Sequence, residues 1–418
     1  MINKTFNTIS VIGLGYIGLP TAAVIASRGI NVIGVDVSAE AVDIINQGKI
    51  HIVEPDLDML VQSAVTTGKL KATLIPEPAD AFIIAVPTPF KDGHKPDLSY
   101  IESAVKKIAP VLKKGDLLIL ESTSPVGTTE KMGEWMAEIR EDLVFPHQSS
   151  DNPDIHLAHC PERVLPGYII QELVANDRVI GGITRQCALE AEALYKVFVK
   201  GSCLITDART AEMAKLTENS FRDVNIAFAN ELSIICDKLK INVWELISLA
   251  NRHPRVNVLN PGPGVGGHCI AVDPWFIVDS APEEARLIEM ARIVNDSKPD
   301  FVLNKLRTIS AEFKHPKIAC LGLAFKADID DLRESPAVEI TKKIISEQIG
   351  QVLIVEPHIN SLPEKLTGKN VELVSLDQAM ESANIILTLT DHTIFKQMKT
   401  DKLKEKVVID ARGIWRDQ

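Results

Sequence analysis

A glycine-rich turn near the start of the chain constrains the fold more than any other feature. Gly13, Gly15 and Gly18 follow a β-branched run at residues 8–12, and a helical pattern comes next. A second apolar run then ends at Asp36. Glycines at this spacing permit a tight turn, close approach of a pyrophosphate and close packing of helix on strand. The pattern predicts a dinucleotide-binding βαβ unit, in which Asp36 bonds to the ribose and favours NAD over NADP.

Short apolar runs alternate with helical patterns at both ends of the chain, which favours parallel sheets with helices on both faces. The predicted strands are residues 8–12, 30–35, 81–86, 117–120, 318–323, 352–355, 385–389 and 407–409. In such sheets ligands lie beyond the carboxyl ends of the strands. The polar residues that follow two of these strands, from Pro87 and from Glu121 onward, are therefore expected to face the cofactor.

Residues 206–250 contain no Pro and no Gly and are rich in helix formers. They predict one long helix and then a shorter one, divided near residues 240–242. Apolar residues occupy much of the circumference of the long helix: Met213, Leu216, Phe221, Val224, Ala227, Phe228, Leu232 and Ile235. A helix that is apolar nearly all round is buried, so this one is expected to join two domains and to pack against a second subunit.

The predicted fold class is α/β, with two Rossmann-like parallel-sheet domains joined by a long central helix and a helical dimerisation domain. We expect an N-terminal NAD-binding domain at residues 1–203, a central helical domain at 204–300 and a C-terminal α/β domain at 301–418. Linkers are expected near residues 199–206 and 298–317.

Composition narrows the class of protein. The chain has 418 residues, 45% of them hydrophobic, and a formal net charge of -11, which argues against nucleic acid as a partner. Residues 1–7 do not resemble a secretory signal, and no apolar run is long enough to span a membrane. The six cysteines have no zinc-binding spacing and are expected to be reduced thiols of a cytoplasmic protein. No metal site is predicted.

A second glycine-rich segment surrounds one of these cysteines. Between Pro261 and Cys269 the chain carries four glycines: Gly262, Gly264, Gly266 and Gly267. They allow a ligand to approach the backbone closely, which a packed core thiol would not need. We therefore interpret Cys269 as a nucleophile, and Cys160, Cys187, Cys203, Cys236 and Cys320 as small buried thiols. Cys269 and Asp273 are four residues apart, which suits one helical turn.

Two further groups of polar residues are candidates for the same site. Lys215 and Asn219 share a face of the long helix, because they are four residues apart. Arg252, His253 and Arg255 are either a solvated turn or cations for an anionic substrate. His268 either lowers the thiol pKa and contacts substrate, or is a loop histidine bonded to backbone.

Taken in order, these segments resemble the nucleotide-sugar 6-dehydrogenase family, which includes UDP-glucose and UDP-mannose dehydrogenases. The resemblance runs nearly end to end. The matching segments are Gly13–Gly18, Pro87–Pro89, Ser122–Gly127, the Lys215–Asn219 helix, Gly266–Cys269, Phe325–Lys326 and Asp331–Pro336. Cys160–Gly167 and Val272–Pro274 are most similar to the members that act on UDP-N-acetyl-D-mannosamine. Pro166 stands where UDP-glucose enzymes carry a second Glu, so that residue's role does not carry over.

The resemblance implies an NAD-dependent, four-electron oxidation of the sugar C6 hydroxymethyl group through a cysteine thiohemiacetal and thioester, supplying a cell-surface polysaccharide. It implies catalytic roles for Cys269, Lys215, Asn219, Asp273, Thr123 and Glu162. It implies cofactor contacts from Gly13, Gly15, Tyr16, Ile17, Gly18, Asp36, Pro87, Thr88, Thr123 and Arg333. It implies substrate contacts from Glu162, Arg163, Val164, Lys215, Asn219, Arg222, Arg252, His253, Arg255, Gly264, Gly266, His268, Phe325, Lys326 and Arg412. A homodimer through the central helical domain is also implied.

Other interpretations remain open from the sequence. A single-oxidation hydroxyacid-type dehydrogenase would explain Lys215 and Asn219 but not Cys269 in its glycine segment. A non-catalytic regulator that binds NAD or a nucleotide sugar would bind without turnover. The sugar is also open among UDP-ManNAc, UDP-GlcNAc, UDP-GalNAc and UDP-glucose, because discrimination depends on a few contacts worth ~1–3 kcal/mol each.

Overall fold

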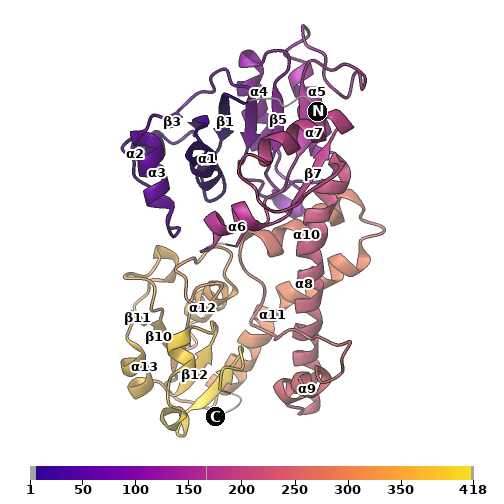
Figure 1. Cartoon of the computed structure of the whole chain (residues 1–418). Helices are drawn as coiled ribbons and strands as arrows, with labels where there is room; N and C mark the ends of the chain where they lie inside the picture. The colour runs from indigo at the N-terminus through magenta and orange to yellow at the C-terminus, as the bar shows by residue number, and fades with distance from the viewer. Residues whose placement is uncertain (1–5, 166, 416–418) are drawn as a thin grey trace. The chain divides into compact units, whose positions relative to one another are not determined.

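The computed structural model describes residues 6–165 and 167–415, except for the side chains of Asp92 and His268. Pro166 lies outside the described residues. The chain divides into two compact units, residues 1–218 and 219–418, each with its own parallel-type sheet (Figure 1). The α/β fold class predicted from the alternating pattern is confirmed.

The first unit is built on an eight-stranded sheet in the order β3-β2-β1-β4-β5-β6-β7-β8. Neighbouring strands run parallel except for β6 and β7, which are antiparallel. The strands are β1 (Thr8–Ile12), β2 (Asn31–Val35), β3 (Leu70–Thr73), β4 (Ala81–Ile84), β5 (Leu117–Leu120), β6 (His156–His159), β7 (Arg178–Gly182) and β8 (Cys203–Asp207).

Helices cover both faces of this sheet and bury two apolar cores. One core holds α1 (Gly18–Ser27), α3 (Leu57–Thr66), α6 (Ile169–Ala175) and α7 (Arg185–Tyr195) against the sheet. The other holds α4 (Ser99–Ile108) and α5 (Thr128–Ala137). The remaining helix, α2 (Ala39–Asn46), starts at Ser38, whose side chain accepts a hydrogen bond from the Ala41 N–H. Strands buried on both sides explain why the sequence shows continuous apolar runs there.

The second unit contains a five-stranded parallel sheet in the order β11-β10-β9-β12-β13. Its strands are β9 (Lys317–Leu321), β10 (Gln351–Val355), β11 (Val371–Leu373), β12 (Ile385–Thr388) and β13 (Val407–Asp410). Its helices are α9 (Val243–Ala250), α10 (His268–Ser280), α11 (Arg286–Ser310), α12 (Pro336–Ser346), α13 (Leu376–Ser382) and α14 (Thr393–Lys396). Two apolar cores again lie on the two faces of the sheet.

The long predicted helix is α8 (Ala208–Leu239), which crosses from the first unit into the second (Figure 1). Its buried face in the second unit carries polar residues among small apolar ones. Asp223, fully buried, is 2.6 Å from the guanidinium of Arg292 on α11. Asn230, also on α8, donates to Asn295 at 2.8 Å and accepts the Gly262 N–H at 2.9 Å. These buried bonds join α8 to α11 and to the start of the second glycine segment.

In the single chain, α8 is buried on only part of its circumference. Phe221, Phe228 and Ile235 are 70%, 54% and 45% exposed, and Met213 is 39% exposed. The contacts with α11 use polar residues on one face of the helix, and the apolar residues lie on another face. Exposed apolar residues seven apart form a stripe on one side of a helix.

The two segments predicted as linkers contain regular secondary structure. Residues 203–207 form β8, which pairs with β7 at the edge of the first sheet. Residues 298–310 belong to α11, so only residues 311–316 separate it from β9. Half-buried edge strands and polar helices give weak apolar signals, which is why both segments read as linkers.

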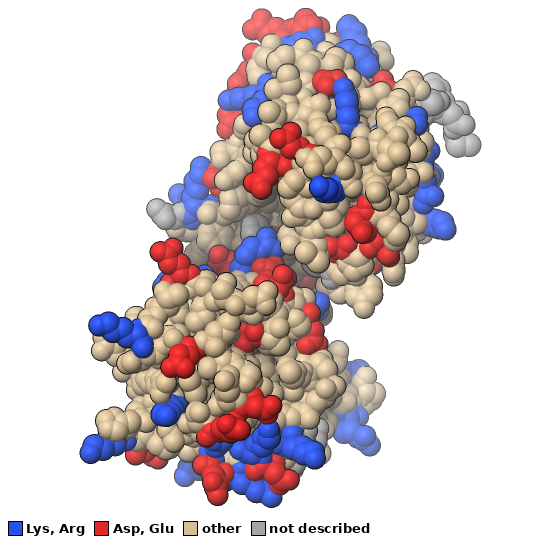
Figure 2. Space-filling view, turned by 90° about the vertical axis from the view of Figure 1, so that its left-hand side faces the viewer, with Lys and Arg blue, Asp and Glu red and all other residues tan. Residues whose placement is uncertain are grey.

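Charges of both signs are interspersed on the face shown in Figure 2, and the described residues there form no continuous basic surface. Among the residues that the structure describes, no helix is both long and apolar enough to cross a bilayer.

Candidate active site

The first glycine turn has the geometry of a dinucleotide cradle. An added Cβ at Gly18 would lie 1.8 Å from the Gly13 carbonyl oxygen, so no side chain fits there. Gly13 has a φ of 89°, which favours glycine. An added Cβ at Gly15 would meet nothing within 4 Å, so this backbone is open to a ligand. The turn begins α1 directly, as a pyrophosphate site at a helix N-terminus requires.

Asp36 at the end of β2 lies beside the same turn. Its carboxylate accepts the Leu14 N–H at 2.8 Å and the Ser38 N–H at 2.9 Å. The structure therefore brings together the residues predicted to hold pyrophosphate and ribose. Tyr16 is 41% exposed and Ile17 is half-buried, so both border the turn.

The ends of β4 and β5 are tied to each other. Thr88, which is buried, donates from Oγ1 to the Thr123 carbonyl at 2.5 Å. Pro87 is exposed beside it. Further along, the Glu212 carboxylate of α8 accepts the N–H groups of Gly127 and Thr129 at 2.6 and 2.8 Å. A carboxylate at the start of α5 is stabilised by the helix dipole, so it fixes the backbone beyond Thr123.

Glu162 is held by a buried ion pair. Arg178 Nη1 lies 2.6 Å from Glu162 Oε2, and the Arg163 N–H donates to Oε1 at 2.7 Å. Both members of the pair are almost fully buried, so removing either would leave an uncompensated charge. The Arg163 side chain pairs with Glu218 at 2.7 Å instead of pointing freely to solvent. Val164 packs against the core on the α1 side of the sheet.

Glu121 was not among the predicted site residues, yet it shares this buried region. The Tyr195 hydroxyl donates to Glu121 Oε1 at 3.0 Å. The Glu121 pKa is raised to about 8, mainly by burial and also by the neighbouring Glu162 charge, against the opposing effect of Arg178. The position of Glu121 directly after the apolar strand β5 was the sequence signal that could have identified it. Arg178 lies on β7, which the sequence did not predict, so no sequence signal marked it.

Lys215 and Asn219 lie one turn apart on α8 and are both half-buried. In the second unit, the Asn219 amide donates to Asp273 Oδ2 at 2.5 Å. Asp273 is 3% exposed and lies one turn after Cys269 on α10. Asn219 and Asp273, which are 54 residues apart, are thus brought together near the start of the helix that carries the cysteine.

Cys269 is exposed in the first turn of α10, whereas Cys160, Cys187, Cys236 and Cys320 are buried. Burial raises the pKa of Cys320 to about 12, which keeps that thiol inert. Cys203 is only half-buried, so its assignment as a fully buried thiol is wrong. The reason is its place on the edge strand β8. The side chain of His268 lies outside the described part of the structure.

The glycines before Cys269 pack closely on a loop of the C-terminal sheet. A Cβ at Gly266 would lie 2.7 Å from the Glu334 carbonyl oxygen and 2.8 Å from Phe325 Cβ. A Cβ at Gly264 would lie 3.0 Å from Pro336. Gly267, with a φ of 80°, faces the Phe325 ring and is the N-cap residue of α10. The structure therefore brings Phe325 against the cysteine segment.

The predicted basic residues of the second unit differ in their exposure and in their ion-pair partners. Arg412 pairs with Asp391 at 2.5 Å, and its Nη1 lies 2.7 Å from where a Gly262 Cβ would be. Lys326 is exposed next to Phe325. Arg333 pairs with Asp331 at 2.7 Å on the surface. The predicted basic residues on α8 and after α9 are exposed: Arg222, Arg252, His253 and Arg255.

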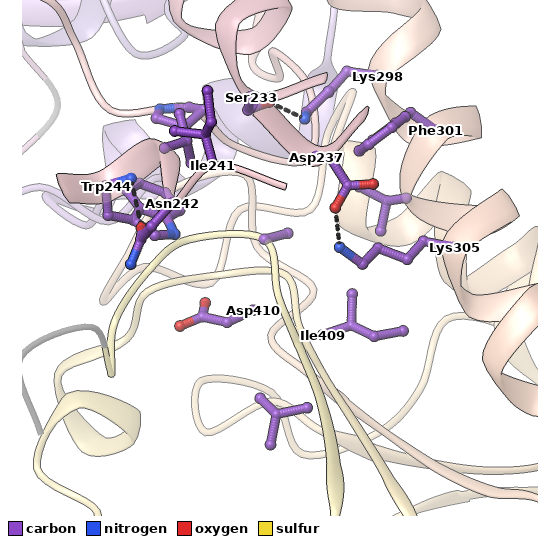
Figure 3. A pocket seen from close by; sticks show the side chains of 15 residues that line it. Ser233, Asp237, Ile241, Asn242, Trp244, Lys298, Phe301, Lys305, Ile409 and Asp410 are labelled. Atoms are coloured by element: carbon purple, nitrogen blue, oxygen red, sulfur yellow. Dashed lines mark hydrogen bonds and ion pairs between the residues drawn. The ribbon is translucent and has the colours of Figure 1, made fainter. Parts of the chain in front are cut away.

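A cavity of about 230 Å³ lies in the second unit between the end of α8, α11 and β13 (Figure 3). Lys298, which is 5% exposed, donates to Ser233 there and lies 4.5 Å from the centroid of the Phe301 ring. Burial lowers the Lys298 pKa to about 8. None of the described residues that line the cavity is a predicted site residue, although Pro261 borders it.

Comparisons with known proteins agree with this geometry. The UDP-glucose/GDP-mannose dehydrogenase family matches in three parts: its NAD binding domain at residues 7–199, its central domain at 209–297 and its UDP binding domain at 319–417. A UDP-N-acetyl-D-mannosamine dehydrogenase of Campylobacter jejuni is 65% identical over 95% of this chain and 98% of its own. An NDP-N-acetyl-D-galactosaminuronic acid dehydrogenase of Ralstonia nicotianae is 64% identical over 99% of this chain and 97% of its own.

Solved structures give the same result. The UDP-D-ManNAc dehydrogenase of Pyrococcus horikoshii superposes with a TM-score of 0.87 at 41% identity, covering 98% of this chain and 96% of that one. The cradle around Gly13–Gly18 and the oxidoreductase relatives define an NAD-dependent dehydrogenase. The chain belongs to the UDP-glucose/GDP-mannose dehydrogenase family and is an NAD-dependent UDP-sugar dehydrogenase.

Proposed function

We propose that this enzyme oxidises the C6 hydroxymethyl group of UDP-N-acetyl-D-mannosamine to the carboxylate, with two NAD⁺ consumed per sugar. The support is the printed names of relatives at 60–65% identity and of structures at about 40% identity. The Ralstonia relative, named for a galactosaminuronic acid, is as similar as the Campylobacter one. UDP-GalNAc is therefore the strongest alternative sugar, ahead of UDP-GlcNAc and UDP-glucose.

NAD⁺ accepts the two hydrides when it is bound, and the residues of the first turn fit it. Gly15 is open, Gly13 and Gly18 make the turn, and Asp36 lies at the ribose position. We propose that Thr88 and Pro87, at the end of β4, and Arg333 complete the cofactor contacts. The carboxylate of Asp36 favours NAD over NADP, because it would repel the 2′-phosphate of NADP.

The covalent step is assigned to Cys269. After the first oxidation removes a hydride and a proton from the alcohol, the thiolate adds to the aldehyde carbon and forms a thiohemiacetal. Loss of the second hydride and the hydroxyl proton gives a thioester. Water then cleaves the C–S bond, releasing the carboxylate and restoring the thiol. The exposed position of Cys269 at the start of α10 supports this role, because an aldehyde offers no second hydride until a nucleophile adds.

We assign the surrounding polar groups as follows. Lys215 and Asn219 stabilise the oxyanion that develops on the C6 oxygen. Asp273 holds the Asn219 amide through the bond between them, which fixes its direction. Thr123 positions water and Glu162 assists proton transfer. The proposed substrate contacts are Glu162, Arg163, Val164, Lys215, Asn219, Arg222, Arg252, His253, Arg255, Gly264, Gly266, His268, Phe325, Lys326 and Arg412.

We further propose a homodimer formed through the central helical segment, residues 204–300, between an NAD domain at 1–203 and a UDP-sugar domain at 301–418. The exposed stripe of Phe221, Phe228 and Ile235 on α8 supports a second copy as the partner. Sedimentation should give a dimer, and Phe228→Asp should shift it toward monomer. Six cysteines without a disulfide fit a cytoplasmic enzyme, and we propose that its product enters a cell-surface polysaccharide.

The test is the yield of NADH per mole of limiting sugar nucleotide, with NAD⁺ in excess. UDP-ManNAc, UDP-GalNAc, UDP-GlcNAc and UDP-glucose are compared side by side. Two NADH from UDP-ManNAc alone would establish both the four-electron reaction and the sugar. Two NADH from UDP-GalNAc instead would keep the mechanism and replace the sugar. One NADH from every sugar would remove the thioester route.

A further inference from the structure

The loop between β9 and α12, residues 322–335, is tied down from the strand ends of the C-terminal sheet. Glu356, directly after β10, is 4% exposed. Its Oε2 accepts the N–H groups of Leu323 and Ala324 at 2.7 and 3.0 Å. Burial opposes ionisation of this carboxyl, but the bonds from His392 and from these N–H groups outweigh it and hold its pKa below the usual range. Glu356 therefore binds the first part of the loop as an anion.

His392, after β12, binds the second part of the loop. Its ring is fully buried, and Nδ1 lies 2.9 Å from the Asp328 backbone nitrogen. Because a backbone N–H can only donate, Nδ1 is the acceptor and the ring proton is on Nε2. Nε2 then donates to Glu356 Oε2 at 3.1 Å. The neutral ring thus links Glu356 to the loop through both nitrogens.

A metal ion is a poor explanation for this cluster. Asp328, His358 and His392 do offer ligand atoms within 4.8 Å of one another. However, the Nδ1 lone pair of His392 accepts a backbone N–H and Nε2 carries the proton. A neutral imidazole used in this way has no lone pair left for a metal.

The hydrogen bonds at Asp328 stabilise a residue whose backbone conformation is unfavourable. Asp328 has a φ of 60°, in the left-handed region that side chains other than glycine rarely adopt. Besides its N–H bond to His392, its carboxylate accepts the Thr393 N–H at 2.9 Å and the Thr393 hydroxyl at 2.6 Å. A strained backbone of this kind persists only where the surroundings over-determine it.

The other side of the same loop meets the cysteine segment. Phe325 packs against Gly266 and Gly267, immediately before Cys269, and Lys326 is exposed beside it. A shift of the loop at Asp328 would therefore move the residues proposed to bind the UDP-sugar.

We propose that Glu356 and His392 are positioning residues for UDP-sugar binding, and that His392 must be neutral to hold the loop. The proposal rests on the substrate role proposed for Phe325 and Lys326. Three titratable groups face the His392 ring: Glu356, Asp328 and His358, whose ring centroid is 5.0 Å away. Protonation would put a hydrogen on Nδ1 opposite the Asp328 N–H, so that bond would break. Asp328 Oδ1, 3.7 Å from Nδ1, would become the competing partner.

Two substitutions separate the two bonds of the ring. In His392→Gln the amide can reach the Nε2 position and donate to Glu356, but the acceptor for the Asp328 N–H is lost. In His392→Asn the Oδ1 can still accept that N–H, while the link to Glu356 is lost. His358→Gln is the matched control, because the His358 side chain bonds to no backbone group of residues 323–335 among the described contacts.

For His392→Gln we expect the KM for the UDP-sugar to rise about ten-fold, with kcat changed less than about two-fold. Hydrogen exchange of the Asp328 amide should become about ten-fold faster, while the β9 and β12 amides are unchanged. His392→Asn should keep the Asp328 amide protected, because its Oδ1 can still accept that N–H.

An unchanged Asp328 amide and an unchanged KM in His392→Gln would overturn the proposal. An equal KM increase in His358→Gln would overturn it too, since the effect would not be specific to the bonded ring. The exchange measurement needs no turnover. If no UDP-sugar is oxidised, the proposed function fails, while the exchange rates still decide whether His392 holds the loop.

Discussion

The two glycine-rich segments of this enzyme use glycine for different reasons. In the turn at Gly13–Gly18 the excluded Cβ of Gly18 would strike the carbonyl of Gly13, five residues earlier in the same turn. In the segment before Cys269 the excluded Cβ of Gly266 would strike Phe325, Glu334 and Pro336, which are far along the chain. The first requirement is local and the second is tertiary.

This difference also separates the two chemical tasks. The first turn leaves Gly15 open and presents backbone N–H groups, so it can only bind a ligand. The second segment ends in the exposed thiol of Cys269 and is shaped by the loop that carries Phe325. The shape of the first turn depends on its own residues, whereas the shape of the segment before Cys269 depends on the folded C-terminal sheet.

Cys269→Ser is expected to give the largest difference between the two segments, by lowering acid formation without changing NAD⁺ affinity. Because the alcohol is a far weaker nucleophile than a thiolate, acid formation should fall by about 10³-fold or more. NAD⁺ affinity, which depends on the first turn, should stay unchanged. Acid yield by mass spectrometry and NAD⁺ titration calorimetry measure the two effects. Full acid yield from this variant would remove the thioester scheme.

Gly18→Ala tests the local requirement. The added methyl would lie 1.8 Å from a backbone oxygen, so we expect a loss of about 3 kcal/mol or more in unfolding free energy and loss of NAD⁺ binding. Gly15→Ala is the control, since its Cβ meets nothing within 4 Å. It should unfold like wild type and lose only NAD⁺ affinity. Denaturant melts of both variants decide the point, and equal stabilities would contradict it.

Gly266→Ala tests the tertiary requirement, with a smaller expected cost of about 1–3 kcal/mol, because the Phe325 loop can shift in part. The KM for the UDP-sugar should rise while NAD⁺ affinity is kept. Gly262→Ala is the comparison: its Cβ would meet only the tip of Arg412 at 2.7 Å, and that side chain can swing away. If Gly266→Ala lowered the affinity for NAD⁺ instead, the proposed difference between the two glycine-rich segments would be wrong.

The buried carboxylates at the strand ends of the two sheets differ in the direction of their pKa shifts. Glu356 has a lowered pKa, whereas the Glu121 pKa is raised from 4.5 to about 8 by burial and the nearby Glu162 charge. Between about pH 4.5 and 8, Glu121 stays protonated in the folded protein but is ionised in the unfolded chain. The free energy of unfolding therefore falls as the pH rises through that window.

Glu121→Gln should remove this fall, because the amide is isosteric with the protonated acid and cannot ionise. The variant should be more stable than wild type at pH 9 by about a few kcal/mol, because each unit of pKa shift corresponds to about 1.4 kcal/mol, and equal to it near pH 4.5. Melting temperatures across that range test this expectation. A variant that is less stable than wild type at every pH would mean that Glu121 works as an anion.

Much of the fold was predictable because strands buried on both faces leave continuous apolar runs. The eight predicted strands all occur, and the break between α8 and α9 lies where the pattern placed it. The edge strands β3, β8 and β11 were missed, because edge strands need few apolar residues. The interior strands β6 and β7 and their antiparallel pairing were missed as well. Periodicity predicted the apolar residues Phe221 and Phe228 on α8, but it does not report what covers them.

The sequence by itself determined the cofactor turn and the alternation of strands and helices, because each depends on neighbours within a few residues. It also distinguished Cys269 from the other five cysteines by the glycines that precede it. Only the tertiary structure decided that Glu162 is paired with Arg178, that Asn219 is held by Asp273 and that His392 bonds across to Asp328. Those bonds join residues that the sheets bring together from distant parts of the chain. Spacing along the chain carries no record of such contacts, whereas buried polar groups require them.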